Sequence, residues 1–216
     1  MSPESTATRL IQFAKCPEPG RVKTRMIPHL SAAQACELHL ELLHWTLGTL
    51  VTSGLGPVQV AIAGDPSHAE VRALRAIVEV SQQQGTDLGQ RMHAALRDAL
   101  RRSSKVLLVG SDCPALTADY LQQAQAALEQ TPVVLGPALD GGYVLIGATR
   151  ITAQVFEGVD WGSECVMSQT RDNLRSAGLA WTELAPLPDI DRPEDLPLWY
   201  QLRHQLRHQP RDRRSR

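Results

Sequence analysis

The stretch that decides the fold of this chain is KVLLVGSDCP, residues 105–114. Its apolar residues, from Val106 to Val109, follow one another without a polar interruption, and a glycine and a polar loop come next. An uninterrupted apolar run is typical of a strand buried on both faces of a parallel sheet, because helices cover both faces of such a sheet. We therefore predict a central strand over residues 105–110.

Outward from this strand, short apolar runs alternate with longer segments whose apolar residues recur at helical spacing. The predicted strands cover residues 10–14, 58–63, 78–81, 132–136, 143–148 and 179–184. The predicted helices cover residues 31–51, 68–77, 87–102, 117–130, 163–177 and 194–208. Ser31 and Gln34 have the spacing of a capping box at the start of the first helix. This alternation predicts an α/β fold with a mostly parallel sheet and helices on both faces.

The chain has 216 residues, which are enough for one sizeable core, and no linker rich in glycine or serine divides them. We therefore expect a single domain over residues 1–208 and a disordered polar tail over residues 209–216. The formal net charge is −1, so no basic field over the whole molecule points to a nucleic acid or to an acidic membrane surface. An anionic ligand would need a local cluster of cations.

The sequence lacks the features of a secreted or membrane protein. Its first residues lack both the charged start and the long apolar run that are typical of a signal peptide. No apolar stretch reaches the ~20 residues of a membrane-spanning helix. The cysteines form no CxxC pair and have no histidine at zinc-ligand spacing; they are Cys16, Cys36, Cys113 and Cys165. We expect reduced thiols and a cytoplasmic protein.

The clearest candidate binding element is the basic loop, KCPEPGRVKTR, residues 15–25, which directly follows the first predicted strand. Ligands of open α/β sheets bind beyond the carboxyl ends of the strands, so this loop lies where a ligand is expected. Gly20 permits a positive φ angle or a close approach of the backbone. Arginine and lysine suit phosphate oxygens, although a solvated basic turn is the alternative. We predict catalytic, phosphate-binding roles for Lys15, Arg21, Lys23 and Arg25.

Asp112 lies just past the end of the central strand, in the segment GSDCP. A carboxylate at this place can bind Mg²⁺ or Mn²⁺, since hard cations prefer oxygen ligands and often bridge phosphates. The alternative role of Asp112 is to cap the following turn through a backbone N–H. Ser111 and Cys113 have no neighbouring histidine that would activate a nucleophile, so a packed thiol is the better interpretation of Cys113.

A second acidic segment is the acidic loop, PDIDRPED, residues 188–195, which leads into the last predicted helix. Pro193 suits the first turn of that helix, which places the N-cap at Asp191 or Arg192. We predict Asp189 and Asp191 as further metal ligands, one of them being the second ligand. Helix capping remains the alternative for Asp191.

Two segments that contain glycines complete the predicted site. The segment ALDGGY, residues 138–143, joins two predicted strands, so a plain hairpin is the alternative to ligand binding. The segment GTDLGQ, residues 85–90, is a polar entry to a helix, where a base or a ribose would fit. We predict nucleotide-binding roles for Asp87, Gly89, Asp140, Gly141, Gly142 and Tyr143.

Taken in order, the segments KCPEPGRVKTR, DLGQRM, GSDCPAL, GPALDGGYVLIG, VDWGSE and DIDRPEDL resemble the DUF2064 family of bacterial proteins. This family is also called rSAM/selenodomain-associated transferase 1, or the arsenosugar-biosynthesis glycosyltransferase family. The resemblance covers residues 10–199. It implies a single-domain GT-A-like (Rossmann-like) fold of the nucleotide-diphospho-sugar transferase superfamily, with a nucleotide over the strand ends and Mg²⁺ on Asp112. The segment DWGSE departs from the DWST-like stretch of many members, so no acceptor role is assigned to Ser163.

The family is more distantly similar to phospholactate guanylyltransferases and molybdenum-cofactor nucleotidyltransferases, and two reactions fit. One is nucleotidyl transfer from a nucleoside triphosphate to a small phosphorylated or oxyanion acceptor. The other is glycosyl transfer from a nucleotide sugar. The cations of the basic loop suit a triphosphate, and Ser111-Asp112-Cys113 has one carboxylate where many glycosyltransferases have a DxD motif, so we favour Mg²⁺-dependent nucleotidyl transfer.

A non-catalytic nucleotide-binding module is a further alternative, which the presence of both the basic loop and Asp112 disfavours. The base and the acceptor stay open. The oligomeric state is also open, because Trp199 and nearby leucines of the last predicted helix either form a homodimer patch or pack on the sheet.

Overall fold

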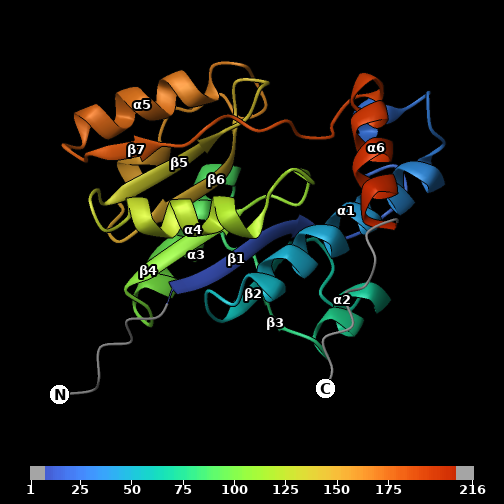
Figure 1. The fold of residues 1–216 in the computed structure, drawn as a ribbon, viewed down its shortest axis with the longest axis horizontal. Helices are drawn as coiled ribbons and strands as arrows, with labels where there is room; N and C mark the ends of the chain where they lie inside the picture. The colour runs from blue at the N-terminus through green and yellow to red at the C-terminus, as the bar shows by residue number, and fades with distance from the viewer. Residues whose placement is uncertain (1–7, 208–216) are drawn as a thin grey trace.

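The computed structural model describes residues 8–207 and contains a mixed sheet with helices on both faces (Figure 1). The predicted polar tail, residues 209–216, lies outside the described residues. The strands are β1 (Thr8–Lys15), β2 (Val58–Ala63), β3 (Glu79–Gln82), β4 (Lys105–Val109), β5 (Val133–Pro137), β6 (Tyr143–Ala148) and β7 (Trp181–Glu183). The helices are α1 (Ala32–Ser53), α2 (Ala69–Leu74), α3 (Leu88–Leu100), α4 (Ala118–Ala127), α5 (Val166–Ser176) and α6 (Leu196–Arg207). Short 3₁₀ helices are η1 (Thr24–Met26), η2 (Ala153–Phe156) and η3 (Pro193–Asp195).

The described strands form one seven-stranded sheet in the order β3-β2-β1-β4-β6-β5-β7. Only β6 among them runs against its neighbours, since it pairs antiparallel with both β4 and β5. It follows β5 through the turn around Gly141, as the hairpin alternative for that segment predicts. The other pairings are parallel, which confirms the predicted α/β class with a mostly parallel sheet.

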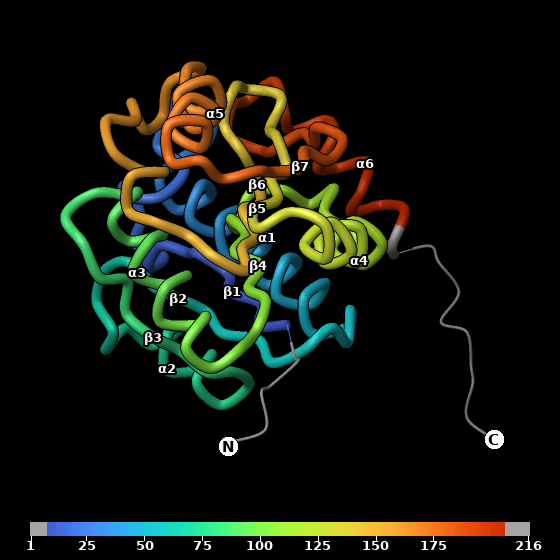
Figure 2. The backbone as a smooth tube through the Cα atoms, turned by 90° about the vertical axis from the view of Figure 1, so that its left-hand side faces the viewer, coloured from blue at the N-terminus to red at the C-terminus, as the bar shows by residue number. Residues whose placement is uncertain are grey.

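The central strand β4 is buried from both sides, as its apolar run predicts. Val106 and Leu108 belong to a core with α3 and α5, whereas Leu107 and Val109 belong to a core with α4. Figure 2, turned by 90°, shows α3 and α5 on one side of the sheet and α1 and α4 on the other. A third core packs α1 and α2 against β2.

A fourth apolar cluster joins α1, η1, the acidic loop and α6. Trp199 of α6 is only 2% exposed and packs edge-on against Trp45 of α1, with ring centroids 5.2 Å apart. Trp199 is therefore covered within the chain, and it forms no exposed patch for a second copy. The cluster also includes Met26, which directly follows the basic loop, and Ile190 of the acidic loop, so it holds two predicted site segments together.

Several helix predictions are too long, among them those of α3 and α4, which end at Leu100 and Ala127 rather than at residues 102 and 130. Helix α5 begins at Val166 rather than at residue 163, because residues 163–165 form a turn in which the backbone N–H of Cys165 donates to Ser163 Oγ at 3.2 Å. Helix α2 ends at Leu74, since the chain turns there toward the edge strand β3. No helix in the described part of the chain is long and apolar enough to cross a membrane.

The capping box at the start of α1 is formed as predicted. Ser31 Oγ accepts from the backbone N–H of Gln34 at 3.2 Å, and Gln34 Oε1 accepts from the backbone N–H of Ser31 at 2.9 Å. These two bonds satisfy donors that the first turn of a helix leaves without partners. Helix α1 carries apolar residues of three of the four cores, so its start matters for the whole fold.

Substitution Ser31→Ala removes this cap and should lower the free energy of unfolding by about 1 kcal/mol, measured by urea denaturation. Thr52→Ala is the matched control, because Thr52 is exposed in the last turn of the same helix. It should change stability by less than about 0.5 kcal/mol. An equal loss in both variants would contradict the capping role of Ser31.

Candidate functional site

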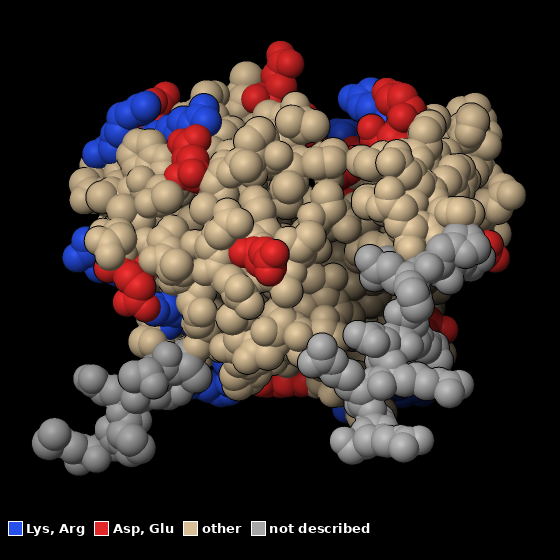
Figure 3. All heavy atoms as spheres, viewed as in Figure 1, with Lys and Arg blue, Asp and Glu red and all other residues tan. Residues whose placement is uncertain are grey.

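The predicted site segments converge at the carboxyl ends of β1, β4 and β5, next to the start of β6. A cavity of about 310 Å³ opens there. Its rim carries four carboxylates, Asp112, Asp140, Asp189 and Asp191. Figure 3 shows a mostly uncharged face that is hollowed at the top of the view, where acidic and basic atoms lie side by side. The sheet thus gathers charged groups from distant parts of the chain at the expected ligand edge.

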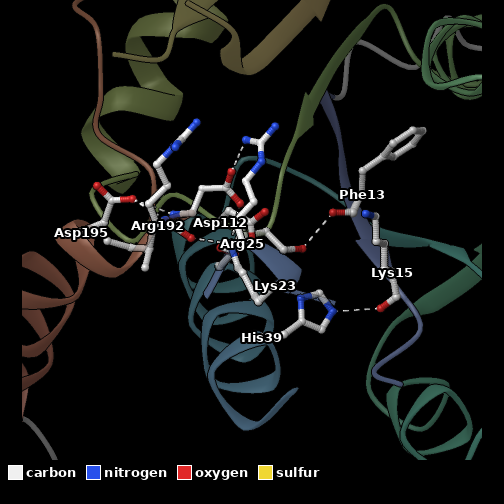
Figure 4. A network of polar contacts seen from close by, with 12 residues as sticks. Phe13, Lys15, Lys23, Arg25, His39, Asp112, Arg192 and Asp195 are labelled. Carbon is white, nitrogen blue, oxygen red and sulfur yellow. Dashed lines mark hydrogen bonds and ion pairs between the residues drawn. The ribbon is translucent and has the colours of Figure 1, made fainter. Parts of the chain in front are cut away.

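Lys23 is the residue that links the basic loop to the carboxylates (Figure 4). Its side chain is 3% exposed, and its Nζ lies 2.7 Å from Asp112 Oδ1 and 3.9 Å from Asp191 Oδ1. The same ammonium donates to the backbone carbonyl of Ile190. Lys23 has φ 49° and ψ 39°, a left-handed conformation that L-residues other than glycine, asparagine and aspartate seldom adopt. The buried ion pair holds it there, which is common at functional sites.

Asp112 is placed by a buried polar network beneath the loop after β4. Ser111 Oγ donates to the carbonyl of Phe13 at 2.8 Å and accepts from Gln12 Nε2 at 2.9 Å, which ties β4 to β1. Burial of the Asp112 carboxyl would raise its pKa, but the charge and the hydrogen bond of Lys23 outweigh burial and lower that pKa. The side chain is still 45% exposed, so an ionised carboxylate faces the cavity.

The acidic loop is positioned by Ile190. Its side chain is fully buried in the cluster under α6, its N–H donates to the carbonyl of Asp112 at 2.8 Å, and its carbonyl accepts from Lys23. Ile190 therefore fixes Asp189 and Asp191 on either side of itself. These backbone contacts explain why the loops after β4 and β7 meet.

The cap of η3 is supplied by Asp195. Asp195 Oδ2 accepts from the backbone N–H groups of Asp191 at 2.9 Å and of Arg192 at 2.7 Å. The N-cap position itself is Arg192, one of the two predicted positions. The carboxylate of Asp191 is not used for capping and instead pairs with Arg25 Nη1 at 2.5 Å.

Asp189 is a carboxylate whose ionised form is disfavoured by its surroundings. Partial burial and the negative charges of Asp140, Asp191 and Asp112 raise its pKa to about 6. Two nearby cations are engaged by other carboxylates, since Arg25 pairs with Asp191 and Lys23 with Asp112. Carboxylates that repel one another in this way provide the hard oxygen donors that a divalent cation prefers.

The remaining cations of the basic loop lie farther from the carboxylates. Arg21 has a side chain that is 77% exposed and pairs with Glu18 at 3.0 Å. Lys15 is exposed at the end of β1, and its backbone carbonyl contacts Nε2 of the buried His39 at 3.0 Å. Gly20 has φ 79°, a positive value of the kind that glycine adopts without strain. The structure therefore brings Lys23 and Arg25 to the carboxylates and leaves Arg21 at the surface.

The turn between β5 and β6 forms part of the cavity wall. Asp140 Oδ1 accepts from the N–H of Gly142 at 2.9 Å. Gly141 has φ 92°, and a side chain there would lie 2.3 Å from the carbonyl oxygen of Glu164, so the turn packs closely on the residues before α5. Tyr143 and Trp161 line the cavity with their rings edge-on and 6.3 Å apart. Gly141 thus has a packing role besides any role toward a ligand.

Asp87 and Gly89 lie beside this cavity, at a second hollow of about 660 Å³ on the other side of Trp161. Asp87 caps α3, because its Oδ1 accepts from the N–H of Gln90 at 2.8 Å. Gly89 allows α3 to approach Trp161 and Phe156, since a side chain there would lie 2.8 Å and 2.9 Å from them. These contacts give both residues structural roles at the border of the site.

The residues that support the site from below were not among the predicted site residues. Gln12 is fully buried and also donates to the carbonyl of Leu43 at 2.9 Å. Burial lowers the pKa of His39, which contacts the start of the basic loop. A glutamine within an otherwise apolar strand was the one available signal for Gln12. Nothing local marks His39 or Ile190, since their roles depend on loops distant in sequence.

In the described residues, no three His, Cys, Asp or Glu side chains are already arranged as a metal site. The donor chemistry nevertheless fits Mg²⁺ or Mn²⁺, because Asp112, Asp189 and Asp191 line one cavity with carboxylate oxygens. The mutual repulsion that raises the pKa of Asp189 is what a divalent cation would relieve.

The fold and the site define a class: nucleotide-using transferases with a GT-A-like fold. A solved structure from Desulfovibrio desulfuricans G20, assigned as a nucleotide-diphospho-sugar transferase, matches with a TM-score of 0.82 and 29% identity over 96% of this chain and 90% of that chain. The structure of Rv0371c from Mycobacterium tuberculosis in complex with manganese matches with a TM-score of 0.56 and 16% identity, over 91% of this chain and 99% of that one. This second likeness shows the fold alone.

The chain belongs to the DUF2064 family, described as an uncharacterized protein conserved in bacteria, whose profile matches residues 46–163. The matched region includes Asp112 and Asp140 but neither the basic loop nor the acidic loop. A phosphoenolpyruvate guanylyltransferase from Sphaerobacter thermophilus is 28% identical over 178 residues, which are 81% of this chain and 84% of that protein. The family resemblance and the transferase class predicted from the motifs are therefore confirmed.

The raised pKa of Asp189 predicts a pH-dependent stability in metal-free buffer containing EDTA. Above pH 6, Asp189 is ionised in both states, and only the folded state then bears the cost of burying that charge and of its repulsion by neighbouring carboxylates. Below its ordinary pKa, Asp189 is protonated in both states and this cost vanishes. Asp189→Asn should therefore stabilise the protein at pH 8 by roughly 1–2 kcal/mol, after allowance for solvent screening.

This gain should fall away as the pH drops from 6 toward 4, as measured by urea denaturation at each pH. Asp172→Asn, on the exposed face of α5, is the control and should show no such gain. A constant difference between Asp189→Asn and the wild type across this range would contradict the electrostatic cause.

Proposed function

We propose that this chain transfers a nucleotidyl group from a nucleoside triphosphate to a small phosphorylated or oxyanion acceptor, with Mg²⁺ or Mn²⁺ at Asp112. The observation that carries the proposal is the buried ammonium of Lys23, 2.7 Å from Asp112 Oδ1. It joins the basic loop, which suits a triphosphate, to the carboxylates that suit a metal. The relative from Sphaerobacter thermophilus supports a nucleoside triphosphate donor and an acidic acceptor.

In this reaction an acceptor oxygen attacks the α-phosphorus, the bond from that phosphorus to the bridging oxygen breaks, and pyrophosphate leaves with the electron pair. Negative charge builds on the leaving oxygens, so positioned cations stabilise the transition state. Lys23 and Arg25 are held at the carboxylate rim by ion pairs and are the residues proposed to take the phosphates. Lys15 and Arg21 are proposed to reach the outer phosphates from the more exposed part of the loop.

Asp112, Asp189 and Asp191 are the residues proposed to hold the divalent cation, with Asp112 first because it lies just past the end of the central strand β4. When bound, that cation would neutralise phosphate charge and polarise the phosphorus–oxygen bonds. Tyr143, Gly142 and Asp140 are proposed to contact the substrate from the cavity wall. Asp87 and Gly89, which line the adjacent hollow, are proposed to contact the nucleotide there.

Glycosyl transfer from a nucleotide sugar is the second candidate. The assignment of the 29% identical structure from Desulfovibrio desulfuricans G20 as a nucleotide-diphospho-sugar transferase favours it. Against it stands the single carboxylate of Ser111-Asp112-Cys113 after β4. The same proposal includes a single domain over residues 1–208, small-molecule partners and a cytoplasmic location. The free thiols of the four cysteines accord with that location.

A thermal-shift panel separates the two reactions, since a ligand that binds the folded state stabilises it by mass action. With Mg²⁺, a nucleoside triphosphate at about 100 times its Kd should add about 2.7 kcal/mol and raise Tm by roughly 5–10 °C. Nucleotide sugars should give a smaller shift. A shift with nucleotide sugars alone would favour glycosyl transfer instead.

Lys23→Ala and Asp112→Asn should each lower pyrophosphate release by at least about 100-fold while the fold stays intact by circular dichroism. The matched controls are Lys105→Ala, at the opposite end of β4, and Asp172→Asn on α5. Both controls should retain near-wild-type turnover. Near-wild-type release by either site variant would refute the site assignment.

A further inference from the structure

The inference concerns Lys23 in the protein without ligands, and it rests on the proposed function, since it takes the carboxylate rim as the metal site. The Lys23 ammonium lies between two of the proposed metal ligands, 2.7 Å from Asp112 Oδ1 and 3.9 Å from Asp191 Oδ1. Asp191 Oδ2 is occupied by Arg25 at 2.5 Å. Two of the three carboxylates are therefore already neutralised by cations that belong to the chain.

Lys23 is held firmly in this position. Its side chain is 3% exposed, its backbone is left-handed with φ 49°, and its ammonium also donates to the carbonyl of Ile190. That carbonyl belongs to a residue that is fully buried in the cluster under α6. The ammonium is thus a built part of the rim, unlike Arg21, whose side chain is 77% exposed on the same loop.

A divalent cation and this ammonium compete for the negative charge of the same two carboxylates. A cation bound to the Asp112 carboxylate would lie close to the ammonium on its Oδ1, and repulsion between such charges is strong in a partly buried site. A nucleotide changes the balance, because its phosphates offer the ammonium a new anionic partner and bring further oxygen donors for the metal. The carboxylate rim is then released from Lys23.

We propose that Lys23 is a tethered counter-cation that keeps the divalent metal off the carboxylate rim until a nucleotide phosphate draws its ammonium away. Metal and nucleotide then bind together, with strong positive coupling, and the metal alone binds weakly. By the reciprocity of linked binding, the metal raises the affinity for the nucleotide by the same factor. Lys23 has two successive partners in this scheme, carboxylate first and phosphate second.

The test measures binding of Mn²⁺ by electron paramagnetic resonance, with no turnover required. Wild-type protein should bind Mn²⁺ weakly alone and at least about tenfold more tightly with a GTP or CTP analogue that has a non-hydrolysable α,β-methylene bridge. Lys23→Met should bind Mn²⁺ alone at least about tenfold more tightly than the wild type, and the analogue should add little. In the measurements without nucleotide, Arg21→Met is the matched control, because it removes the same charge from the same loop and its ion-pair partner is Glu18, outside the carboxylate rim.

Without nucleotide, Arg21→Met should stay within about threefold of the wild type in Mn²⁺ affinity, since exposed charges are largely screened. Equal Mn²⁺ affinity of wild type and Lys23→Met, or an equal gain in both variants, would overturn the proposal. If Lys23→Met does not fold by circular dichroism, Lys23→Gln replaces it, and tight Mn²⁺ binding by the wild type without nucleotide also overturns the proposal. Absence of any nucleotide response would instead sink the proposed function and leave the Mn²⁺ comparison between variants valid.

Discussion

The ion pair between the buried ammonium of Lys23 and the carboxylate of Asp112 is the interaction on which the arrangement of the site depends. It joins the loop after β1 to the loop after β4, and Ile190 adds the loop after β7 through its carbonyl. A buried charge without a partner is costly, so each member of this pair constrains the other. The left-handed backbone of Lys23 is the local consequence of that constraint.

Two kinds of contact support the Lys23–Asp112 ion pair: apolar packing on both faces of the sheet, and hydrogen bonds between β1 and the end of β4. The central strand β4 is covered by α3 and α5 on one face and by α4 on the other. This packing fixes the position of the strand end that carries Asp112. Between β1 and β4, Gln12 Nε2 donates to Ser111 Oγ, which in turn donates to the carbonyl of Phe13. Such directional contacts between buried polar groups favour one register of the two strand ends.

The relatives of this chain and the geometry of its site indicate the same class of protein. The family profile covers the middle of the chain, where the central strand and the turn before β6 lie, and not the two charged loops. Those loops are far apart in the sequence and meet through the sheet and through the Lys23–Asp112 ion pair, so family membership and the geometry of the rim are independent observations. The charged rim lies at the carboxyl ends of the strands, where open α/β folds bind their ligands.

The sequence by itself determined the order and type of the elements, since apolar periodicity and capping residues act over a few neighbouring positions. The run from Val106 to Val109, the Ser31 capping box and the β5–β6 hairpin could all be predicted for this reason. It also placed the charged loops at one edge of the sheet.

Only the tertiary structure decided which charges meet. Lys23 is buried against Asp112 whereas Arg21 stays in solvent, Asp195 caps η3 whereas Asp191 binds Arg25, and Trp199 packs on Trp45. These partners are far apart in the chain, and their distances follow from strand order and from the apolar cluster under α6. Local sequence patterns carry no information about such distances, which is why the site could be located but not assembled from the sequence.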